Sequence, residues 1–353
     1  MKKLMVIPLV AAGMAAMVGC SKTPVKEAAK NDAINLANLD TAVAPGTDFY
    51  QYACGGWMKN NPLKPEYARF GTFDQLRDNN QEQIRTLIEG LSETPGQEGS
   101  VGQKIGMLFA MGMDSVKLNE DGYAPIKDQL AEINKLGTKD ELTKMVATLH
   151  KEGMAPFFAL YVGADEKNSS MNIVQLYQAG LGMGDRDYYL LEDESSQKMR
   201  EAYKNYITRL FTLIGSSPEQ ADAAVNAIMK IERGIAEVSF SREDLRDSQK
   251  NYNKMSIEDF KAKNDLLNWD VYFESMGMMD IKYLDAKQLS FYEGLSALMK
   301  NTTLDEQKYY LTFNLLSFAA PYLSDPFVAA DFDFYGNCLL YTSDAADDRI
   351  SVD

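Results

Sequence analysis

Histidine limits the chemistry that this sequence can carry out. The chain of 353 residues contains one histidine, His150, in the stretch Leu149-His150-Lys151-Glu152-Gly153. A histidine-based zinc site needs several ligands close together, and a Ser–His or Cys–His pair needs a histidine beside the nucleophile. No second histidine follows at helical spacing. We therefore interpret His150 as a structural residue in the last turn of a helix, where a partial positive charge would suit the helix dipole.

Carboxylates and glycines provide no stronger catalytic candidate. With 51 acidic residues, pairs of carboxylates arise by chance, so none can be assigned as an acid–base pair. Asp185-Arg186-Asp187 is better explained by local charge pairing or by a helix cap. The alternating Gly180, Gly182 and Gly184 lack the Lys-Ser/Thr of a phosphate-binding loop and the spacing of a dinucleotide fingerprint. We interpret residues 180–190 as an irregular loop that ends in buried tyrosines.

One stretch near the N-terminus concentrates aromatic residues. Asp48-Phe49-Tyr50-Gln51-Tyr52-Ala53-Cys54-Gly55-Gly56-Trp57 includes four of them, and Trp57 is one of two tryptophans in the chain. So much aromatic area needs a large partner surface. The Gly55-Gly56 pair allows a tight turn or a close approach to another element. We expect an anchoring turn that packs against the rest of the fold, followed by an extended connection through Pro62 and Pro65.

The first residues predict export. Lys2-Lys3 precede an apolar run over residues 4–18, and Gly19-Cys20 follow it. The run is too short and too rich in Ala and Gly to be read as a membrane-spanning helix. Met17-Val18-Gly19-Cys20 resembles a bacterial lipobox, so we predict that Cys20 is lipidated and anchors the protein to the membrane. The alternative is ordinary signal-peptidase cleavage nearby. The predicted location is the bacterial cell envelope, lipid-anchored, in the periplasm or at the outer membrane.

The amino-acid composition limits the class of protein and the kinds of partner that fit this chain. The chain is 45% hydrophobic and 25% charged, which is typical of a globular protein. Its net charge of −15 and its lack of a basic block argue against nucleic acid as a partner, because binding to phosphates depends on clustered Lys and Arg. The three cysteines, Cys20, Cys54 and Cys338, do not make a disulfide framework.

Hydrophobic periodicity predicts a mainly α-helical fold. Helices are predicted over 73–91, 101–113, 126–136 and 199–214, and after capping boxes that begin at Thr138, Ser217 and Thr303. Pro321 should end the last of these. Ser256 should cap a short helix, and Asn268-Trp269 should lie in a connection. Two strand-like runs, 157–162 and 173–177, flank a polar segment and predict a small β-hairpin.

Several segments resemble the neprilysin and endothelin-converting-enzyme family of zinc metallopeptidases, which includes bacterial oligopeptidases. The first segment is the aromatic stretch with Asn60-Asn61-Pro62, followed by Arg69-Phe70-Gly71-Thr72-Phe73. The second is Gly180-Leu181 with Asp185-Arg186-Asp187-Tyr188-Tyr189. The third joins Glu232…Ala236 to Arg246-Asp247 and Tyr252-Asn253-Lys254-Met255-Ser256. Phe332-Asp333-Phe334-Tyr335-Gly336 is the last matching stretch.

The resemblance implies one multi-helical lobe of a two-lobed peptidase, which closes around a chamber that admits small peptides. Its zinc would be held by a His-Glu-x-x-His helix and a further glutamate, and would activate water for attack on a peptide bond. This chain contains no such motif. We therefore expect an inactive N-terminal fragment of an exported zinc endopeptidase that cleaves oligopeptides. Zinc would bind only in the full-length enzyme, and the catalytic lobe would be the missing partner.

Two further expectations concern this chain on its own. Purified alone, it should show no chelator-sensitive peptide hydrolysis. It should also be poorly soluble, because helices that would face the absent lobe expose an apolar patch. The alternative hypothesis, from a different class, is a non-catalytic surface lipoprotein that binds peptides or a protein partner.

The resemblance also assigns one substrate-binding residue. Arg69 occupies the position that, in neprilysin-like enzymes, holds the C-terminal carboxylate of bound peptides, and a guanidinium can meet a carboxylate with two parallel hydrogen bonds. The alternative is a structural salt bridge with a nearby acid. In animal relatives the cysteine that matches Cys54 forms a disulfide near the far end of the chain, and that partner would lie outside this sequence.

These inferences give four segments. Residues 1–20 form a lipoprotein signal peptide, 21–44 a polar tether, and 45–336 a neprilysin-like N-terminal domain. From Asn337 the sequence has no helical or strand period. We interpret residues 337–353 as a non-native tail, the alternative being a divergent natural C-terminus.

Overall fold

The structure is a computed structural model that describes residues 35–63, 67 and 69–339. The chain divides into two compact units, residues 1–75 and 76–353, and each is described here by itself. The predicted signal peptide with Cys20, most of the tether, Pro65 and residues 340–353 lie outside the described residues.

In the first unit, the aromatic stretch forms helix α1 (Phe49–Asn60), so the expected anchoring turn is wrong. Asp48 begins the helix, because its side chain accepts a hydrogen bond from the backbone N–H of Gln51 at 2.9 Å. The close approach expected of the glycine pair is present. A Cβ on Gly56 would lie 2.3 Å from the carbonyl oxygen of Ala37, beside the 3₁₀ turn η1 (Leu36–Asn38). Glycine is therefore required at position 56 even though it lies within a helix.

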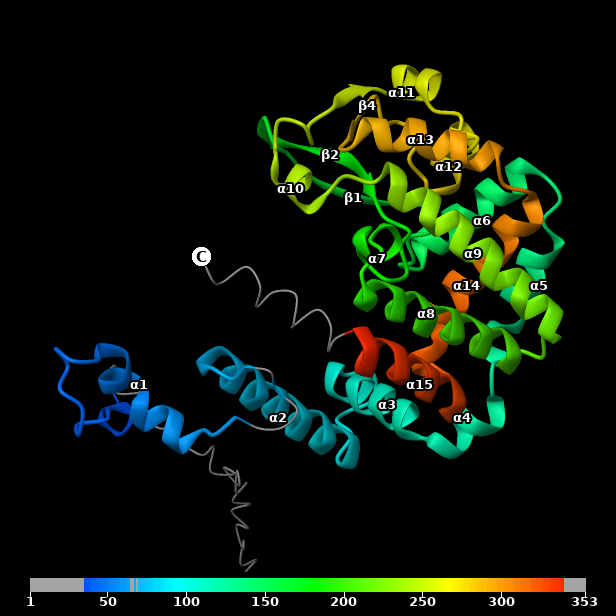
Figure 1. Ribbon diagram of the computed structural model, residues 1–353. Coiled ribbons are helices and arrows are strands. Elements are labelled where there is room, and N and C mark those ends of the chain that lie inside the picture. The colour runs from blue at the N-terminus through cyan, green and yellow to red at the C-terminus, as the bar shows by residue number, and fades with distance from the viewer. Residues whose placement is uncertain (1–34, 64–66, 68, 340–353) are drawn as a thin grey trace, which may run out of the picture. The chain divides into compact units, whose positions relative to one another are not determined.

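The second unit is mainly helical, as predicted, and Figure 1 shows its helices with their labels. Helix α2 (Thr72–Glu93) begins in the first unit and continues into the second. The other helices are α3 (Val101–Met113), α4 (Ser115–Asp121), α5 (Lys127–Lys135), α6 (Lys139–Lys151), α7 (Asp187–Leu190), α8 (Glu194–Leu213), α9 (Pro218–Val238), α10 (Arg242–Arg246), α11 (Ile257–Lys263), α12 (Trp269–Ser275), α13 (Leu289–Lys300), α14 (Leu304–Ala319) and α15 (Asp325–Asp331). Short 3₁₀ turns lie at η2 (Ala124–Ile126) and η3 (Ala320–Tyr322), and a π-helix, η4, covers Phe332–Leu339.

Local sequence signals explain where many helices begin and end. All three predicted capping boxes are present, at Thr138, Ser217 and Thr303. Ser256 caps α11 as expected. Asn268, which was expected in a connection, instead caps α12, and Trp269 is the first residue of that helix and is buried.

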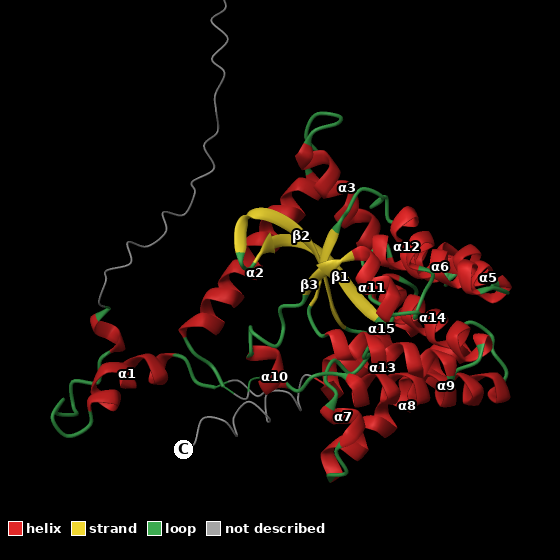
Figure 2. Ribbon diagram, turned by 90° about the horizontal axis from the view of Figure 1, so that it is seen from above, coloured by secondary structure: helices red, strands yellow, loops and turns green. Residues whose placement is uncertain are grey.

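The predicted hairpin is confirmed and is longer than the sequence indicates. Strand β1 (Phe158–Asp165) pairs antiparallel with β2 (Asn168–Gln178), so much of the polar segment belongs to the strands. Two short strands, β3 (Lys254–Ser256) and β4 (Tyr283–Ala286), complete a sheet of order β1-β2-β4-β3, in which β2 and β4 are parallel. Figure 2 shows the strands in yellow. The sequence did not predict this second pair.

Helix α9 lies at the centre of the second unit, where it packs against α8, α13 and α14 (Figure 1). Its apolar positions Ile228, Ile231 and Ile235 are fully buried. Within the described part of the chain, every helix is too short or too polar to cross a lipid bilayer.

Candidate functional site

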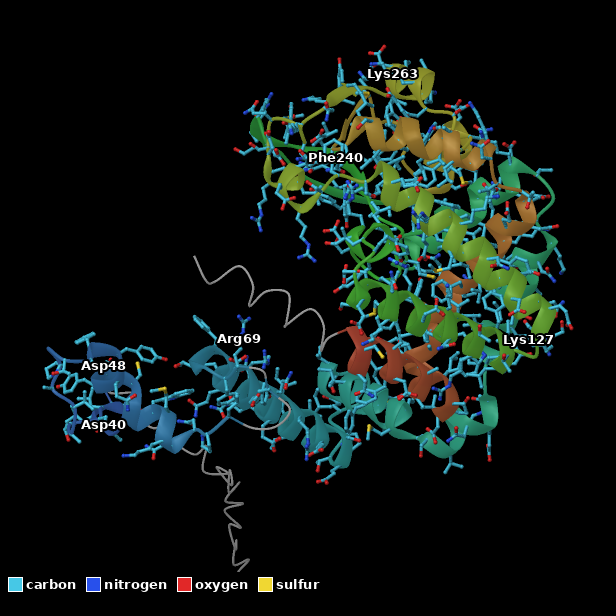
Figure 3. The ribbon with its side chains drawn as sticks, viewed as in Figure 1. Asp40, Asp48, Arg69, Lys127, Phe240 and Lys263 are labelled. Carbon is cyan, nitrogen blue, oxygen red and sulfur yellow. The ribbon has the colours of Figure 1, made fainter. Side chains whose placement is uncertain are left out.

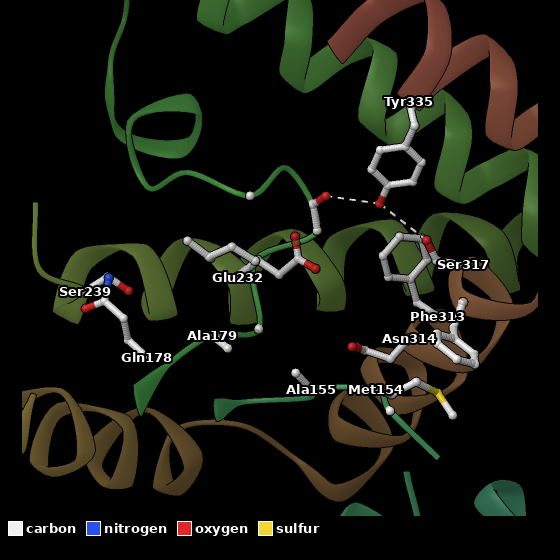
Figure 4. Close-up of a pocket in the computed structure, with 16 residues that line it drawn as sticks. Met154, Ala155, Gln178, Ala179, Glu232, Ser239, Phe313, Asn314, Ser317 and Tyr335 are labelled. Carbon is white, nitrogen blue, oxygen red and sulfur yellow. Dashed lines mark hydrogen bonds between the residues drawn. The ribbon is translucent and has the colours of Figure 1, made fainter. Parts of the chain in front are cut away.

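A cleft of about 540 Å³ lies where the chain enters β1 and leaves β2. Its walls come from segments far apart in the sequence: residues 153–155 before the hairpin, residues 178–184 after it, and side chains of α9, α14 and η4. Figure 4 shows Glu232, Asn314 and Tyr335 among the residues that surround it. The glycine segment that resembles the peptidase family therefore forms one wall of a real cavity.

The glycines of this wall meet two different requirements. Gly180 has a φ of 97° and Gly184 a φ of 78°, conformations that favour residues without a Cβ. Gly182 is required for space, because a Cβ there would lie 1.9 Å from the hydroxyl oxygen of Tyr203. The interpretation of an irregular loop is confirmed for residues 180–186. Residues 187–190 instead form helix α7, in which Tyr189 is fully buried and Tyr188 is half-buried.

A buried carboxylate holds this loop against α9. Glu232, which is 1% exposed, accepts hydrogen bonds from the hydroxyls of Tyr189 at 2.6 Å and of Tyr203 at 2.9 Å. The Tyr189 oxygen in turn accepts the backbone N–H of Met183 at 3.0 Å. Burial raises the pKa of Glu232 to about 7, although hydrogen bonds from the two tyrosines and from the backbone of Gly182 oppose the rise.

A third tyrosine, Tyr310, fixes the entrance to β1. The Tyr310 hydroxyl donates to the carbonyl oxygen of Gly180 at 2.8 Å and accepts the N–H of Phe157 at 3.1 Å. Phe157 has a φ of 68°, a strained conformation for an aromatic residue, and its side chain is fully buried. Tyr335 also contributes, because its hydroxyl donates to the carbonyl oxygen of Gly182 at 3.0 Å (Figure 4). These contacts shape the wall of the cleft.

Sequence reasoning did not single out Glu232, although a signal was available. It lies four residues after Ile228 and three before Ile235, both of which belong to the predicted apolar face of its helix. A charged residue on such a face is either paired or functional, because burying a lone carboxylate is costly. Counting polar residues at core positions would have found it.

Asp185-Arg186-Asp187 makes structural contacts, but the partners of Asp185 and Arg186 outside the segment are distant in the sequence rather than local. Asp185 forms an ion pair with Arg242 and accepts the N–H of Asp187 at 2.8 Å. The Arg186 guanidinium donates to the carbonyl oxygen of Ser239 at 2.5 Å.

His150 has a structural environment. Its Nε2 lies 3.1 Å from the carbonyl oxygen of Pro156, so Nε2 carries the proton and Nδ1 accepts from the Tyr272 hydroxyl at 2.6 Å. Burial lowers the pKa of His150 to about 4. The expected interaction of a positive charge with the helix dipole is therefore wrong, because the ring is neutral at physiological pH. With both ring nitrogens engaged, His150 does not fit a zinc site.

The described residues offer no other metal centre. No group of three or more His, Cys, Asp and Glu side chains among them is arranged to hold a metal ion. Cys54, in α1, is a free thiol.

Arg69 lies in the first unit, in the segment that leads into α2 (Figure 3). The two residues that follow it are held by contacts within the segment. Phe70 stacks on Trp57 with ring centroids 6.0 Å apart, and the N–H of Gly71 donates to the side chain of Asp74 at 2.9 Å. The side chain of Arg69 itself is exposed.

Known proteins match most of the length of this chain. The sequence model described as Peptidase family M13 matches residues 45–351. Endothelin-converting enzyme 1 of Mus musculus is 29% identical over 359 residues, which are 94% of this chain and 46% of that protein. The chain thus spans about half the length of the relatives it matches.

Solved structures resemble the same region. The zinc metalloprotease Zmp1 of Mycobacterium tuberculosis, in complex with an inhibitor, superimposes with a TM-score of 0.76 at 26% identity and covers 86% of this chain and 46% of its own. PepO from Lactobacillus rhamnosis HN001 shares the fold with a TM-score of 0.66 at 20% identity, over 83% of this chain and 46% of its own.

Proposed function

Because this chain belongs to peptidase family M13, we propose that it forms the N-terminal, mainly helical lobe of an exported zinc endopeptidase that cleaves oligopeptides. The observation that carries the proposal is the family match over residues 45–351, supported by the fold shared with a zinc metalloprotease. In the complete enzyme, zinc would activate water for attack on the peptide carbonyl. His150 does not fit that role, so the proposal assigns the zinc ligands to residues outside this sequence.

In this proposal, the chain binds and orients the substrate. Arg69 would hold the C-terminal carboxylate of the peptide, which its exposure favours. The test compares binding of a peptide with a free C-terminal carboxylate with binding of its amide. Arg69→Met should abolish a preference of about tenfold for the acid, whereas Arg85→Met, on the exposed surface of α2, should preserve it. An unchanged preference in Arg69→Met would assign Arg69 to a structural salt bridge.

The proposal predicts that the chain alone has no peptidase activity. A quenched fluorescent peptide incubated with the purified chain and zinc should remain intact, and turnover inhibited by EDTA would contradict the proposal. Sequencing the locus beyond the codon for Gly336 provides the second test. A downstream, in-frame His-Glu-x-x-His codon string is expected.

The proposed membrane anchor is Cys20, in residues that the structure does not describe. Labelling with a radioactive fatty acid should mark the protein in a bacterial host, and Cys20→Ala should remove the label and release the protein from the membrane fraction. A labelled Cys20→Ala variant would exclude the lipoprotein hypothesis, and an unlabelled but exported wild type would support ordinary signal cleavage.

A second candidate function is favoured by the single histidine of the sequence. In that case the protein is a non-catalytic surface lipoprotein that binds peptides or a protein partner. A genuine stop after Asp353 in independent sequence reads would support this candidate over the endopeptidase.

A further inference from the structure

The cleft beside the glycine loop carries a charge that nothing in the described structure balances. Among the described residues that line it, Glu232 is the one with a carboxylate, and none is Lys or Arg. No described Lys or Arg forms an ion pair with Glu232, whose described hydrogen-bond donors are tyrosine hydroxyls and the backbone of Gly182. A buried carboxylate is stabilised most strongly by a cation, and the described residues supply none here.

Two other oxygen atoms at the cleft can accept a hydrogen bond from a ligand, those of the Asn314 side chain and of the Gly182 carbonyl. The Asn314 amide nitrogen is engaged, since it donates to the Tyr310 carbonyl oxygen at 2.8 Å. Figure 4 shows the Asn314 side-chain oxygen pointing into the cleft. The carbonyl oxygen of Gly182, which accepts one hydrogen bond from Tyr335, keeps a second lone pair. A ligand with several N–H donors is therefore complementary to this surface.

Part of the remaining lining is apolar. Met154, Leu181, Phe313 and Phe318 border the same cleft as Glu232. Such walls suit an alkyl chain that carries its charge at one end, as the lysine side chain does. The volume of about 540 Å³ is large enough for more than one amino-acid residue.

We propose that this cleft binds the primary ammonium group of a peptide, from an N-terminus or a lysine side chain, with Glu232 as its counterion. The proposal deepens the proposed function and rests on it for the peptide as ligand class. The ammonium group donates to Glu232 and to the acceptor oxygens of the wall, and the apolar side chains cover the adjoining carbon atoms.

Three peptides test the proposal by calorimetry on the full chain at pH 8. Acetyl-Ala-Lys-Ala-amide carries a side-chain ammonium, Ala-norleucine-Ala-amide carries an N-terminal ammonium, and acetyl-Ala-norleucine-Ala-amide carries neither. At least one charged peptide should bind about tenfold or more tightly than the neutral peptide, and the stronger of the two identifies the source of the ammonium group. Equal affinities for all three would overturn the proposal.

Substitutions test whether the preference for charged peptides arises in the cleft. Glu232→Gln should remove the preference for the charged peptides, whereas Glu237→Gln, the same change at an exposed position of α9, should preserve it. If Glu232→Gln does not fold, Ala179→Phe decides instead, because Ala179 lines the cleft and a ring at this position should occupy it and abolish binding. Binding that survives in Ala179→Phe, or a preference that survives in folded Glu232→Gln, would contradict the proposal.

The ammonium site and the proposed endopeptidase function can be rejected independently of each other. These experiments measure equilibrium binding and require no hydrolysis. Equal affinities for the three peptides would reject the ammonium site and leave the endopeptidase assignment intact. A locus without zinc-binding codons would reject the endopeptidase and leave an observed ammonium site as the property of a peptide-binding protein.

Discussion

Tyr189 donates a hydrogen bond to Glu232 across 2.6 Å, although 43 positions separate them in the sequence. The contact joins the end of the glycine loop to the central helix α9. Tyr203, from α8, donates to the other carboxylate oxygen, so one buried side chain connects three elements. The two sequence segments that contain Tyr189 and Glu232 both resemble the peptidase family, and the structure shows that they meet at one network.

The first prediction concerns the pH dependence that Glu232 imposes on stability. Its pKa is raised in the folded protein to about 7 from an ordinary value of 4.5, so the folded state binds more protons between these values. This contribution to stability is therefore present below pH 4.5 and lost as the pH rises to 7. The loss amounts to roughly 3 kcal/mol. Glu232→Gln, measured by urea unfolding from pH 4.5 to 8, should lack it.

Gln can replace Glu232 without breaking the network, because the Tyr203 hydroxyl can rotate to accept a hydrogen bond from the new amide. Glu237→Gln, exposed on the same helix, should retain the wild-type profile. A profile of Glu232→Gln that parallels the wild type would show that this carboxyl is not the titrating group.

The second prediction concerns His150, whose protonation changes the stability of the fold in the opposite direction to that of Glu232. Its pKa falls from 6.5 to about 4 on folding, so the unfolded state binds more protons between these values. Stability should therefore fall by roughly 3 kcal/mol as the pH drops from 6.5 to 4. In His150→Gln the amide can donate to Pro156 and accept from Tyr272 without titrating, so this fall should disappear. A fall of the same size in the variant would contradict the assignment.

The two pH windows overlap, and their slopes oppose each other. Between about pH 4.5 and 6.5, protonation of Glu232 stabilises the fold while protonation of His150 would destabilise it. The free energy of unfolding of the wild type should therefore change less with pH in this range than that of either single variant. The ordinary surface carboxylates contribute equally in all three forms.

Much of the fold follows from local sequence signals. The helix over Val101–Met113 and the capping boxes at Thr138, Ser217 and Thr303 were predicted correctly, because periodicity and capping act within a few residues. Helix α1 was missed, because its Gly55-Gly56 pair indicates a turn. These glycines are needed for contact with residues before the helix, which local propensity does not reveal.

The parts of the structure that the sequence did not predict depend on contacts between distant segments. Strand β4 is four residues long and pairs in parallel with β2 from far along the chain, so neither its length nor its period predicts it. The cleft is assembled from segments around residues 154, 180, 232, 314 and 335, and no single motif contains it. The resemblance identified three of these segments, around residues 180, 232 and 335, but not their meeting point.

The third prediction tests the close approach in the glycine loop. Gly182→Ala places a methyl group 1.9 Å from the Tyr203 hydroxyl, which is held by Glu232 and cannot move freely. We expect a loss of about 1–3 kcal/mol in the free energy of unfolding. Gly90→Ala is the matched control, because a Cβ there meets nothing within 4 Å and should stabilise α2 slightly. Equal effects of the two substitutions would contradict the packing described here.

The fourth prediction concerns helix α3, which is apolar yet largely exposed. Val101, Leu108 and Met111 are 73%, 72% and 67% exposed, and Gly106 is the buried residue of this helix. A helix so rich in apolar residues is normally covered. We expect the purified chain to self-associate, and Leu108→Glu with Met111→Lys to shift it toward monomer in sedimentation velocity. The same charges at Asn205 and Thr208 of α8, also three residues apart, should leave self-association unchanged. A wild type that is monomeric at high concentration would show that this apolar surface does not drive association.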